Sequence, residues 1–340
     1  MKRVSRREAL KRGLLGLAGA ASAAGAASAS SIAHATSLDG AAHPDPHTLM
    51  TGGVPSAAGI DPTAFLRHFD YGEVSKRPNG QTVREYQLVA IDRALEIMPG
   101  VFYSAWTFDG QVPGPTLRCT EGDLVRVHFR NAGTHQHSVH FHGFHPASMD
   151  GVFEQIDPGG SYVYEFEAAP FGLHLYHCHT MPLKRHIAKG LYGAMIIDPK
   201  RGVGGARPDA DEMVMVLNGF DVNFDAENEV YAVNTVPFAY QAQPIVLKRG
   251  RLNRIYLVNV LEFDLINSMH IHGNFFRLFR TGTSLESSEL TDTVSLGQGE
   301  RHILEFTYDR PGKFMFHAHQ SEFAELGWMG MFDVQDGLIA

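Results

Sequence analysis

From about residue 81 to the C-terminus, hydrophobic and polar residues alternate in short runs that are separated by turn-forming residues. Leu124–Phe129 and Ser161–Phe166 are two such runs, with an apolar or aromatic residue at every second position. A period of two is typical of a strand with one buried face, and short strands between turns favour a sandwich. The 35 glycines and 17 prolines suit the same turn-rich architecture. We therefore predict an all-β protein.

The strand-rich region consists of two halves that repeat each other. Residues 122–131, 137–143 and 177–179 match residues 250–259, 267–273 and 317–319, in the same order. A break rich in glycine and arginine at 201–209 lies between the halves. Repeats in a fixed order indicate copies of one structural unit. We expect two tandem β-sandwich domains over residues 81–205 and 206–340, preceded by an arm without periodicity over residues 36–80.

Residues 1–35 read as an export signal. A charged start is followed by a small-residue apolar stretch and by Ala33-His34-Ala35, which fits a cleavage site. The pair Arg6-Arg7 resembles a twin-arginine signal, so we expect a periplasmic or extracellular protein. Beyond residue 35 the chain has 23 basic and 36 acidic residues, a formal charge of −13 that argues against binding nucleic acid. No stretch is apolar over the roughly 20 residues that a membrane span requires.

Histidine is the residue type that points to chemistry, with 19 copies against two cysteines. Two cysteines form at most one bridge, which excludes a disulfide scaffold. Each repeated half carries two His-x-His pairs: His140/His142, His177/His179, His270/His272 and His317/His319. Residues i and i+2 of a strand share a face, so each pair can offer both imidazoles to one metal site. A single such pair is usually a pair of surface histidines, but four at equivalent positions indicate a site for several metal ions.

The first half has three additional metal-binding residues. His137 precedes its first pair, Cys178 lies inside its second pair, and His186 follows eight residues later. By counting, the second half has Asn267, Ala318 and Leu326 at these places. A set of two histidines and one cysteine indicates a blue-copper electron-transfer site, because thiolate selects soft metals.

At these residues the chain resembles a two-domain, laccase-like multicopper oxidase with type 1 copper in the first domain. That family has the motifs H-x-H-G, H-x-H, H-x-x-H-x-H and H-C-H-(x)n-H, and all four occur here. The resemblance implies a cupredoxin-like Greek-key sandwich for each domain and four coppers per subunit. It implies His137, Cys178 and His186 for type 1 copper, His140 and His270 for type 2, and His142, His177, His179, His272, His317 and His319 for the type 3 pair.

Two features depart from the pattern or lie outside it. Leu191 stands where a methionine is the usual axial group of type 1 copper, and Met181 is the nearby thioether that can substitute for it. Asp150 and Glu322 follow copper segments and are expected as proton relays, or else as ordinary loop carboxylates.

The resemblance implies one-electron oxidation of phenols or aromatic amines at type 1 copper. Four electrons would then reduce O2 to water at a trinuclear cluster, and relatives imply a homotrimer. One alternative is a copper-containing nitrite reductase, a family in which a non-ligand residue follows the cysteine; here His179 does. The other is a copper-handling protein, a cuprous oxidase or resistance protein, although the 12 methionines are scattered.

Overall fold

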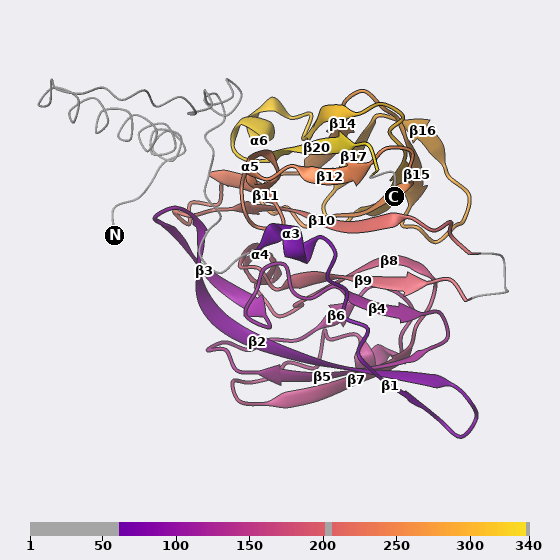
Figure 1. Ribbon diagram of the computed structural model, residues 1–340. Coiled ribbons are helices and arrows are strands. Elements are labelled where there is room, and N and C mark those ends of the chain that lie inside the picture. The colour runs from indigo at the N-terminus through magenta and orange to yellow at the C-terminus, as the bar shows by residue number, and fades with distance from the viewer. Residues whose placement is uncertain (1–60, 201–205, 338–340) are drawn as a thin grey trace, which may run out of the picture.

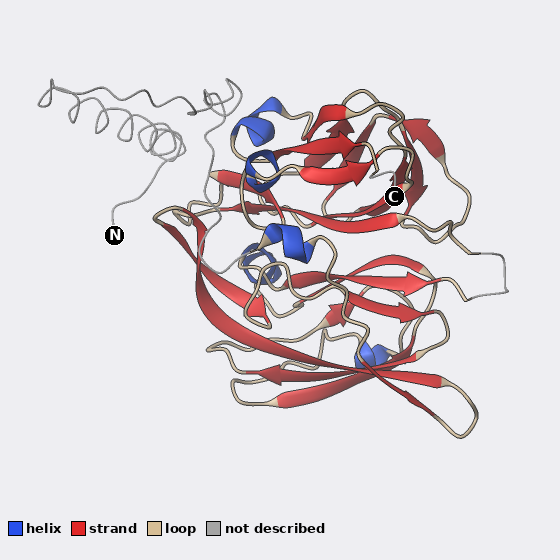
Figure 2. Cartoon of the chain, in the orientation of Figure 1, coloured by secondary structure: helices blue, strands red, loops and turns tan. Residues whose placement is uncertain are grey.

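A computed structural model describes residues 61–200 and 206–337 of the chain. Strands dominate it, in a first domain coloured indigo to magenta and a second coloured orange to yellow (Figures 1 and 2). The predicted export signal and residues 36–60 of the predicted arm lie outside the described residues. None of the described helices has the length and apolar character needed to cross a membrane.

Domain 1 packs two mixed sheets face to face, one ordered β1-β2-β5-β7 with β3 paired to β2, the other ordered β4-β9-β8-β6. The first sheet contains β1 (Glu73–Lys76), β2 (Thr82–Met98), β3 (Val101–Phe108), β5 (Leu124–Asn131) and β7 (Ser161–Glu167). The second contains β4 (Leu117–Thr120), β6 (His140–Phe141), β8 (Gly172–His177) and β9 (Tyr192–Asp198). Short helices are α3 (Pro62–Phe65), α4 (Leu183–Ala188) and the 3₁₀ turn Ala147–Met149.

Domain 2 repeats this arrangement with sheets ordered β11-β10-β13-β18-β15-β16 and β12-β20-β19-β14-β17. The first contains β10 (Asp211–Phe220), β11 (Val230–Val233), β13 (Asn253–Asn259), β15 (Phe276–Arg280), β16 (Glu289–Thr291) and β18 (Arg301–Phe306). The second contains β12 (Ile245–Lys248), β14 (Ile266–Ile271), β17 (Thr293–Gly297), β19 (Gly312–His317) and β20 (Met329–Gln335). Its helices are α5 (Ala239–Ala242) and α6 (Ser321–Glu325).

The alternation seen in the sequence places each core. On β5, Val125, Val127 and Phe129 are fully buried and pack between the sheets of domain 1, while the residues between them are more exposed. β7 pairs with β5 in antiparallel register and adds Tyr164 and Phe166 to the same core. The structure confirms the all-β class and the two tandem sandwiches expected from the sequence.

A third core joins the two domains. β9 and β10 lie side by side at their boundary in Figure 1, and both strands are buried on two faces. Met195 and Ile197 face the core of domain 1, whereas Ala194 and Ile196 face domain 2. On β10, Val214 and Val216 face domain 1, whereas Met213, Met215 and Leu217 face the core of domain 2. Burying two apolar sheet faces against each other fixes the domains as one body.

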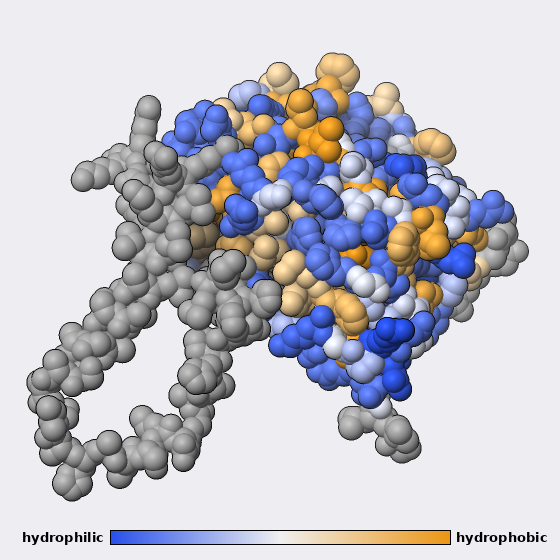
Figure 3. Space-filling model, turned by 90° about the horizontal axis from the view of Figure 1, so that it is seen from above, coloured by the Kyte–Doolittle hydropathy of each residue, from blue (hydrophilic) through white to orange (hydrophobic). Residues whose placement is uncertain are grey.

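The surface outside these cores is mixed. Figure 3, seen from the domain 2 end, shows hydrophobic residues in separate patches among hydrophilic ones. Such a mixture is ordinary for a protein surface that faces water.

Candidate metal centres

The histidine pairs owe their direction to strand alternation. The residue between the two histidines is Phe141, Cys178, Ile271 or Ala318, and each of these four is at most 1% exposed. Because neighbouring side chains of a strand point to opposite faces, an inward middle residue turns both histidines outward. In one pair of the four, that inward residue is a cysteine.

Cys178 meets two histidines inside domain 1. Its Sγ lies 3.3 Å from His186 Nδ1 and 3.9 Å from His137 Nδ1, and the two nitrogens are 3.3 Å apart. His137 and Cys178 are fully buried and His186 is 3% exposed. We call these three residues the His₂Cys site. His186 arrives from α4, which begins after the connection at Met181-Pro182.

The backbone around the His₂Cys site orients the sulfur. The Ser138 N–H points at Cys178 Sγ from 3.4 Å, and the Cys178 N–H donates to the carbonyl of Leu191 at 3.0 Å. Leu191 is fully buried in the same core as Cys178, whereas Met181 is 75% exposed. Of the two residues considered for the axial position, Leu191 therefore lies in the buried wall of the site and Met181 at the surface.

Burial sets the protonation of these groups. It lowers the pKa of both His137 and His186 to about 4, so both imidazoles are neutral at pH 7 and have a lone pair to offer. Burial also raises the pKa of the Cys178 thiol. A metal ion binding here must therefore displace one proton, from sulfur.

His140, His142, His177 and His179 form a second group, the domain 1 tetrad. β6 pairs with β8 so that His140 stands opposite His177, and the ring centroids of His140 lie 5.1–5.4 Å from the other three. His140 donates Nδ1–H to the carbonyl of Asp150 at 2.8 Å, and His177 to that of Cys178 at 2.9 Å. Their Nε2 lone pairs are thereby left for a metal.

His270, His272, His317 and His319 form the domain 2 tetrad, with the same construction. β14 pairs with β19 so that His270 stands opposite His317. His270 donates Nδ1–H to the carbonyl of Asp292 at 2.9 Å, and His317 to that of Ala318 at 2.6 Å. In both tetrads two Nε2 atoms face each other, at 3.3 Å between His142 and His177 and at 3.0 Å in domain 2.

The structure does not bring the two tetrads together. Among the described residues of this one chain, no ring of one tetrad contacts a ring of the other, and each forms its own group of ligand atoms. The domain 2 tetrad is also the more open, with His272 and His319 exposed. Each tetrad is therefore a separate donor set within this chain.

The two carboxylates expected as relays differ in position. Asp150 Oδ1 lies 3.1 Å from His140 Nδ1 and 3.6 Å from His145 Nε2, so Asp150 touches the domain 1 tetrad. Gly151 allows this approach, because a Cβ there would lie 2.1 Å from the Val139 carbonyl. Glu322 lies on α6 with its side chain exposed.

Domain 2 fills the place that corresponds to the His₂Cys site. The Ala318 N–H donates to the Trp328 carbonyl as the Cys178 N–H does to that of Leu191, and the indole N–H of buried Trp328 donates to Asn267 at 3.0 Å. Counting in the sequence matched His186 with Leu326. The structure instead matches it with Phe323, because the Leu191 N–H donates to the His186 carbonyl and the Trp328 N–H donates to the Phe323 carbonyl. The connection from Ala318 to Trp328 is three residues shorter than the one from Cys178 to Leu191.

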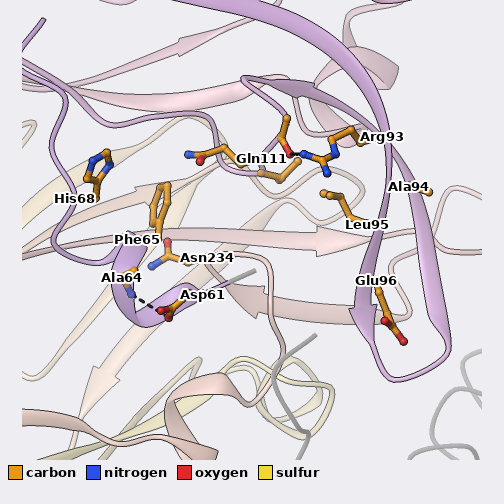
Figure 4. A pocket seen from close by; sticks show the side chains of 12 residues that line it. Asp61, Ala64, Phe65, His68, Arg93, Ala94, Leu95, Glu96, Gln111 and Asn234 are labelled. Atoms are coloured by element: carbon orange, nitrogen blue, oxygen red, sulfur yellow. Dashed lines mark hydrogen bonds between the residues drawn. The ribbon is translucent and has the colours of Figure 1, made fainter. Parts of the chain in front are cut away.

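Trp106 is a site residue that the sequence did not single out. Its ring centroid lies 4.7 Å from that of His186, 5.5 Å from that of His137 and 4.4 Å from that of His135. It comes from β3, far from every histidine motif, so only the fold could reveal it. A pocket between α3 and the β2–β3 hairpin, drawn in Figure 4, includes Asp61, His68 and Arg93 in its lining but no residue of the three groups.

The chemistry of the donor sets fits copper. Two neutral imidazoles and one buried sulfur match the trigonal ligand set of a blue-copper site, which the softness of sulfur favours. All-imidazole sets such as the tetrads suit copper as well, since imidazole is a ligand of intermediate softness.

Comparison with known proteins agrees with these donor sets. Two family models, both described as multicopper oxidase, match residues 94–202 and 208–337. A solved multicopper oxidase is 55% identical, with a TM-score of 0.80, and the match covers 82% of this chain and 98% of that one. Copper nitrite reductase from Nitrosomonas europaea is 27% identical with a TM-score of 0.68, covering 74% of this chain and 94% of that one.

Curated relatives are more distant. The copper-containing nitrite reductase of Neisseria meningitidis serogroup A is 29% identical over 257 residues, which is 68% of this chain and 64% of the relative. Copper resistance protein A of Escherichia coli is 38% identical over 124 residues, 35% of this chain and 20% of the relative. The chain thus spans less than two thirds of these curated relatives.

Proposed function

The chain belongs to the multicopper oxidase family, and from this premise we propose that it is a laccase-like oxidase. Its substrates would be phenols or aromatic amines as electron donors and O2 as the acceptor. Copper, four ions per subunit, would take up single electrons at the His₂Cys site and deliver four of them to O2 at a trinuclear site made of the two tetrads.

The observation that carries this proposal is the second tetrad. The domain 2 histidines keep the strand pairing, the Nδ1–H donors and the facing Nε2 atoms of domain 1. A site for one copper ion would not need eight imidazoles prepared in this way. Two matching tetrads supply the number of ligands that three copper ions need.

The chain itself connects the two kinds of site. Cys178 belongs to the His₂Cys site, and its sequence neighbours His177 and His179 belong to the domain 1 tetrad. The link between the sites is therefore a few covalent bonds, reinforced where His177 Nδ1–H bonds the Cys178 carbonyl. We assign the role of relaying protons to Asp150, which lies beside His140, and to Glu322 on α6.

Assembly follows from the separation of the tetrads. Because one chain presents two half-sites apart from each other, a complete site requires domain 1 of one subunit to meet domain 2 of the next. A head-to-tail contact of this kind closes into a ring when its rotation permits, and we propose a homotrimer with three trinuclear sites. We also propose that residues 1–35 direct export by the twin-arginine route to the periplasm or beyond.

Nitrite reduction is the second candidate, and the curated relatives favour it. Copper handling is a third, from the partial match to copper resistance protein A. Purified, copper-loaded protein distinguishes the three by metal analysis, optical spectra, O2 uptake and nitrite turnover. We expect four coppers per chain, a blue band and O2 consumption with a phenol. Two coppers with nitrite turnover would establish the reductase, and copper binding without turnover of phenol or nitrite would establish the handling protein.

A further inference from the structure

Two buried polar atoms without a hydrogen-bond partner among the described residues lie near Gly133, next to the His₂Cys site. One is His137 Nε2 and the other is Asp92 Oδ1. Because His137 turns Nδ1 toward Cys178, its Nε2 carries the ring proton and is a donor. A carboxylate oxygen is an acceptor. A buried donor and a buried acceptor are each costly to leave unbonded, so this pair is chemically complementary.

Gly133 occupies the point between them. A Cβ built on Gly133 would lie 2.9 Å from Asp92 Oδ1 and 3.1 Å from His137 Nε2, so both atoms border the same small space. The two atoms therefore lie near each other at Gly133, at a separation that a direct hydrogen bond or one bridging water can span.

The fold holds Asp92 at this point. Asp92 on β2 pairs with Trp106 on β3, and the Trp106 ring packs against both histidines of the His₂Cys site. The other carboxylate oxygen, Oδ2, accepts a hydrogen bond from the Thr134 hydroxyl. With Oδ2 committed to Thr134, Oδ1 is the oxygen turned toward His137.

We propose that Asp92 is a positioning residue for the His₂Cys site, accepting the Nε2–H of His137 directly or through one water beside Gly133. The inference rests on the proposed type 1 copper. A carboxylate bonded to the outer nitrogen of a ligating imidazole fixes the ring and makes it a stronger donor. Asp92 therefore favours the cupric state and increases the affinity of the site for copper.

The test compares copper-loaded Asp92→Asn with wild type and with Glu96→Gln. Asparagine keeps the shape and an acceptor for Thr134 but removes the charge. Glu96 is on the same strand and accepts a hydrogen bond from the Gly100 N–H, so Glu96→Gln controls for loss of a carboxylate from the hairpin. The readouts are the type 1 potential, titrated through the Cys178 absorption, and the loss of type 1 copper to a chelator.

We expect Asp92→Asn to raise the potential and to weaken copper retention by roughly 10–100-fold, with Glu96→Gln unchanged. Gly133→Ala puts a methyl group between the two atoms and should shift both readouts in the same direction as Asp92→Asn. An Asp92→Asn protein with wild-type potential and retention would overturn the proposal. So would a Gly133→Ala protein with both readouts unchanged, because the hydrogen bond could not then pass this point. Wild-type protein without a blue band would instead refute the proposed function itself.

Discussion

Cys178 joins two environments because of its place directly after strand β8. Its side chain points into the core of domain 1 while those of His177 and His179 point outward, so one tripeptide serves both kinds of site. Substituting its sulfur therefore changes one site and leaves the histidines of the other in place.

We expect Cys178→Ser to abolish both the blue absorption and the oxidation of phenols, because the thiolate would give the colour and would be the path by which electrons leave the His₂Cys site. The copper bound by the tetrads should remain, since none of their ligands is altered. Optical spectra, metal analysis and O2 uptake measure this. Cys119→Ser is the control, since Cys119 is buried in the same core away from the histidines. Phenol oxidation at the normal rate in Cys178→Ser would contradict the assignment.

The second prediction at the scale of the residue concerns Leu191 and the potential of the type 1 copper. A thioether donates electron density to copper and favours its oxidised state, whereas leucine donates none and keeps water away. We expect Leu191→Met to lower the type 1 potential and to slow the oxidation of weak donors, with the Cys178 absorption retained. Met181→Leu, a change at the exposed thioether, should leave the potential as it is. An unchanged potential in Leu191→Met would place another group on the axis.

At the scale of the element, β18 carries a polar side chain that the sheet does not satisfy. His302 is 2% exposed, and neither of its ring nitrogens has a hydrogen-bond partner among the described residues. Burial lowers the pKa of His302 below its ordinary 6.5. Below pH 6.5 the unfolded chain takes up a proton here that the folded chain does not, so stability falls as the pH falls from 6.5 toward the folded pKa.

We therefore expect His302→Leu to stabilise the copper-loaded protein by about 1–3 kcal/mol at pH 5 and to flatten the decline in stability between pH 7 and 5. Denaturant unfolding at several pH values measures both effects. His68→Gln, at an exposed histidine, should follow the wild-type curve. A His302→Leu protein with the wild-type slope would show that other groups cause the acid sensitivity.

Strands were predictable from the sequence where hydrophobic and polar residues alternate and where the two halves repeat each other. β5, β7 and the four histidine pairs followed from a period of two and from the match between halves. The period is lost in β9 and β10, because strands buried on both faces read as continuous apolar runs. The match of His186 with Phe323 required backbone hydrogen bonds across a shorter connection. Asp92 and Trp106 reach the His₂Cys site by strand pairing, which leaves no local motif.

At the scale of the whole molecule, the separated tetrads allow a test by complementation. His140→Ala removes a ligand from the domain 1 tetrad, and His270→Ala removes one from the domain 2 tetrad. In a mixed ring, an intact domain 1 from one variant can meet an intact domain 2 from the other. Equal co-expression should restore about a quarter of the wild-type sites, whereas each variant alone stays inactive.

Purification of differently tagged subunits through both tags removes the uniform trimers, so each remaining mixed trimer should have one intact site, about a third of the wild-type number. The control is a mixture of His140→Ala with His142→Ala, which disables the same half twice and should recover nothing. If mixed assemblies of His140→Ala with His270→Ala had no activity, each trinuclear site would be built within one subunit. Sedimentation of the wild-type protein provides the independent check, with a fully active monomer excluding the ring.

The tryptophan in domain 2 has a consequence for how this molecule can change. If the two halves descend from one ancestral domain, Trp328 and its hydrogen bond to Asn267 hinder the formation of a second His₂Cys site in domain 2. Ala318→Cys alone would add a thiol with no imidazole beside it, and restoring a histidine at 267 would break the bond to a buried indole. Restoring that histidine therefore costs stability before it gives a metal site. Under the proposed function, this cost keeps electron entry in domain 1.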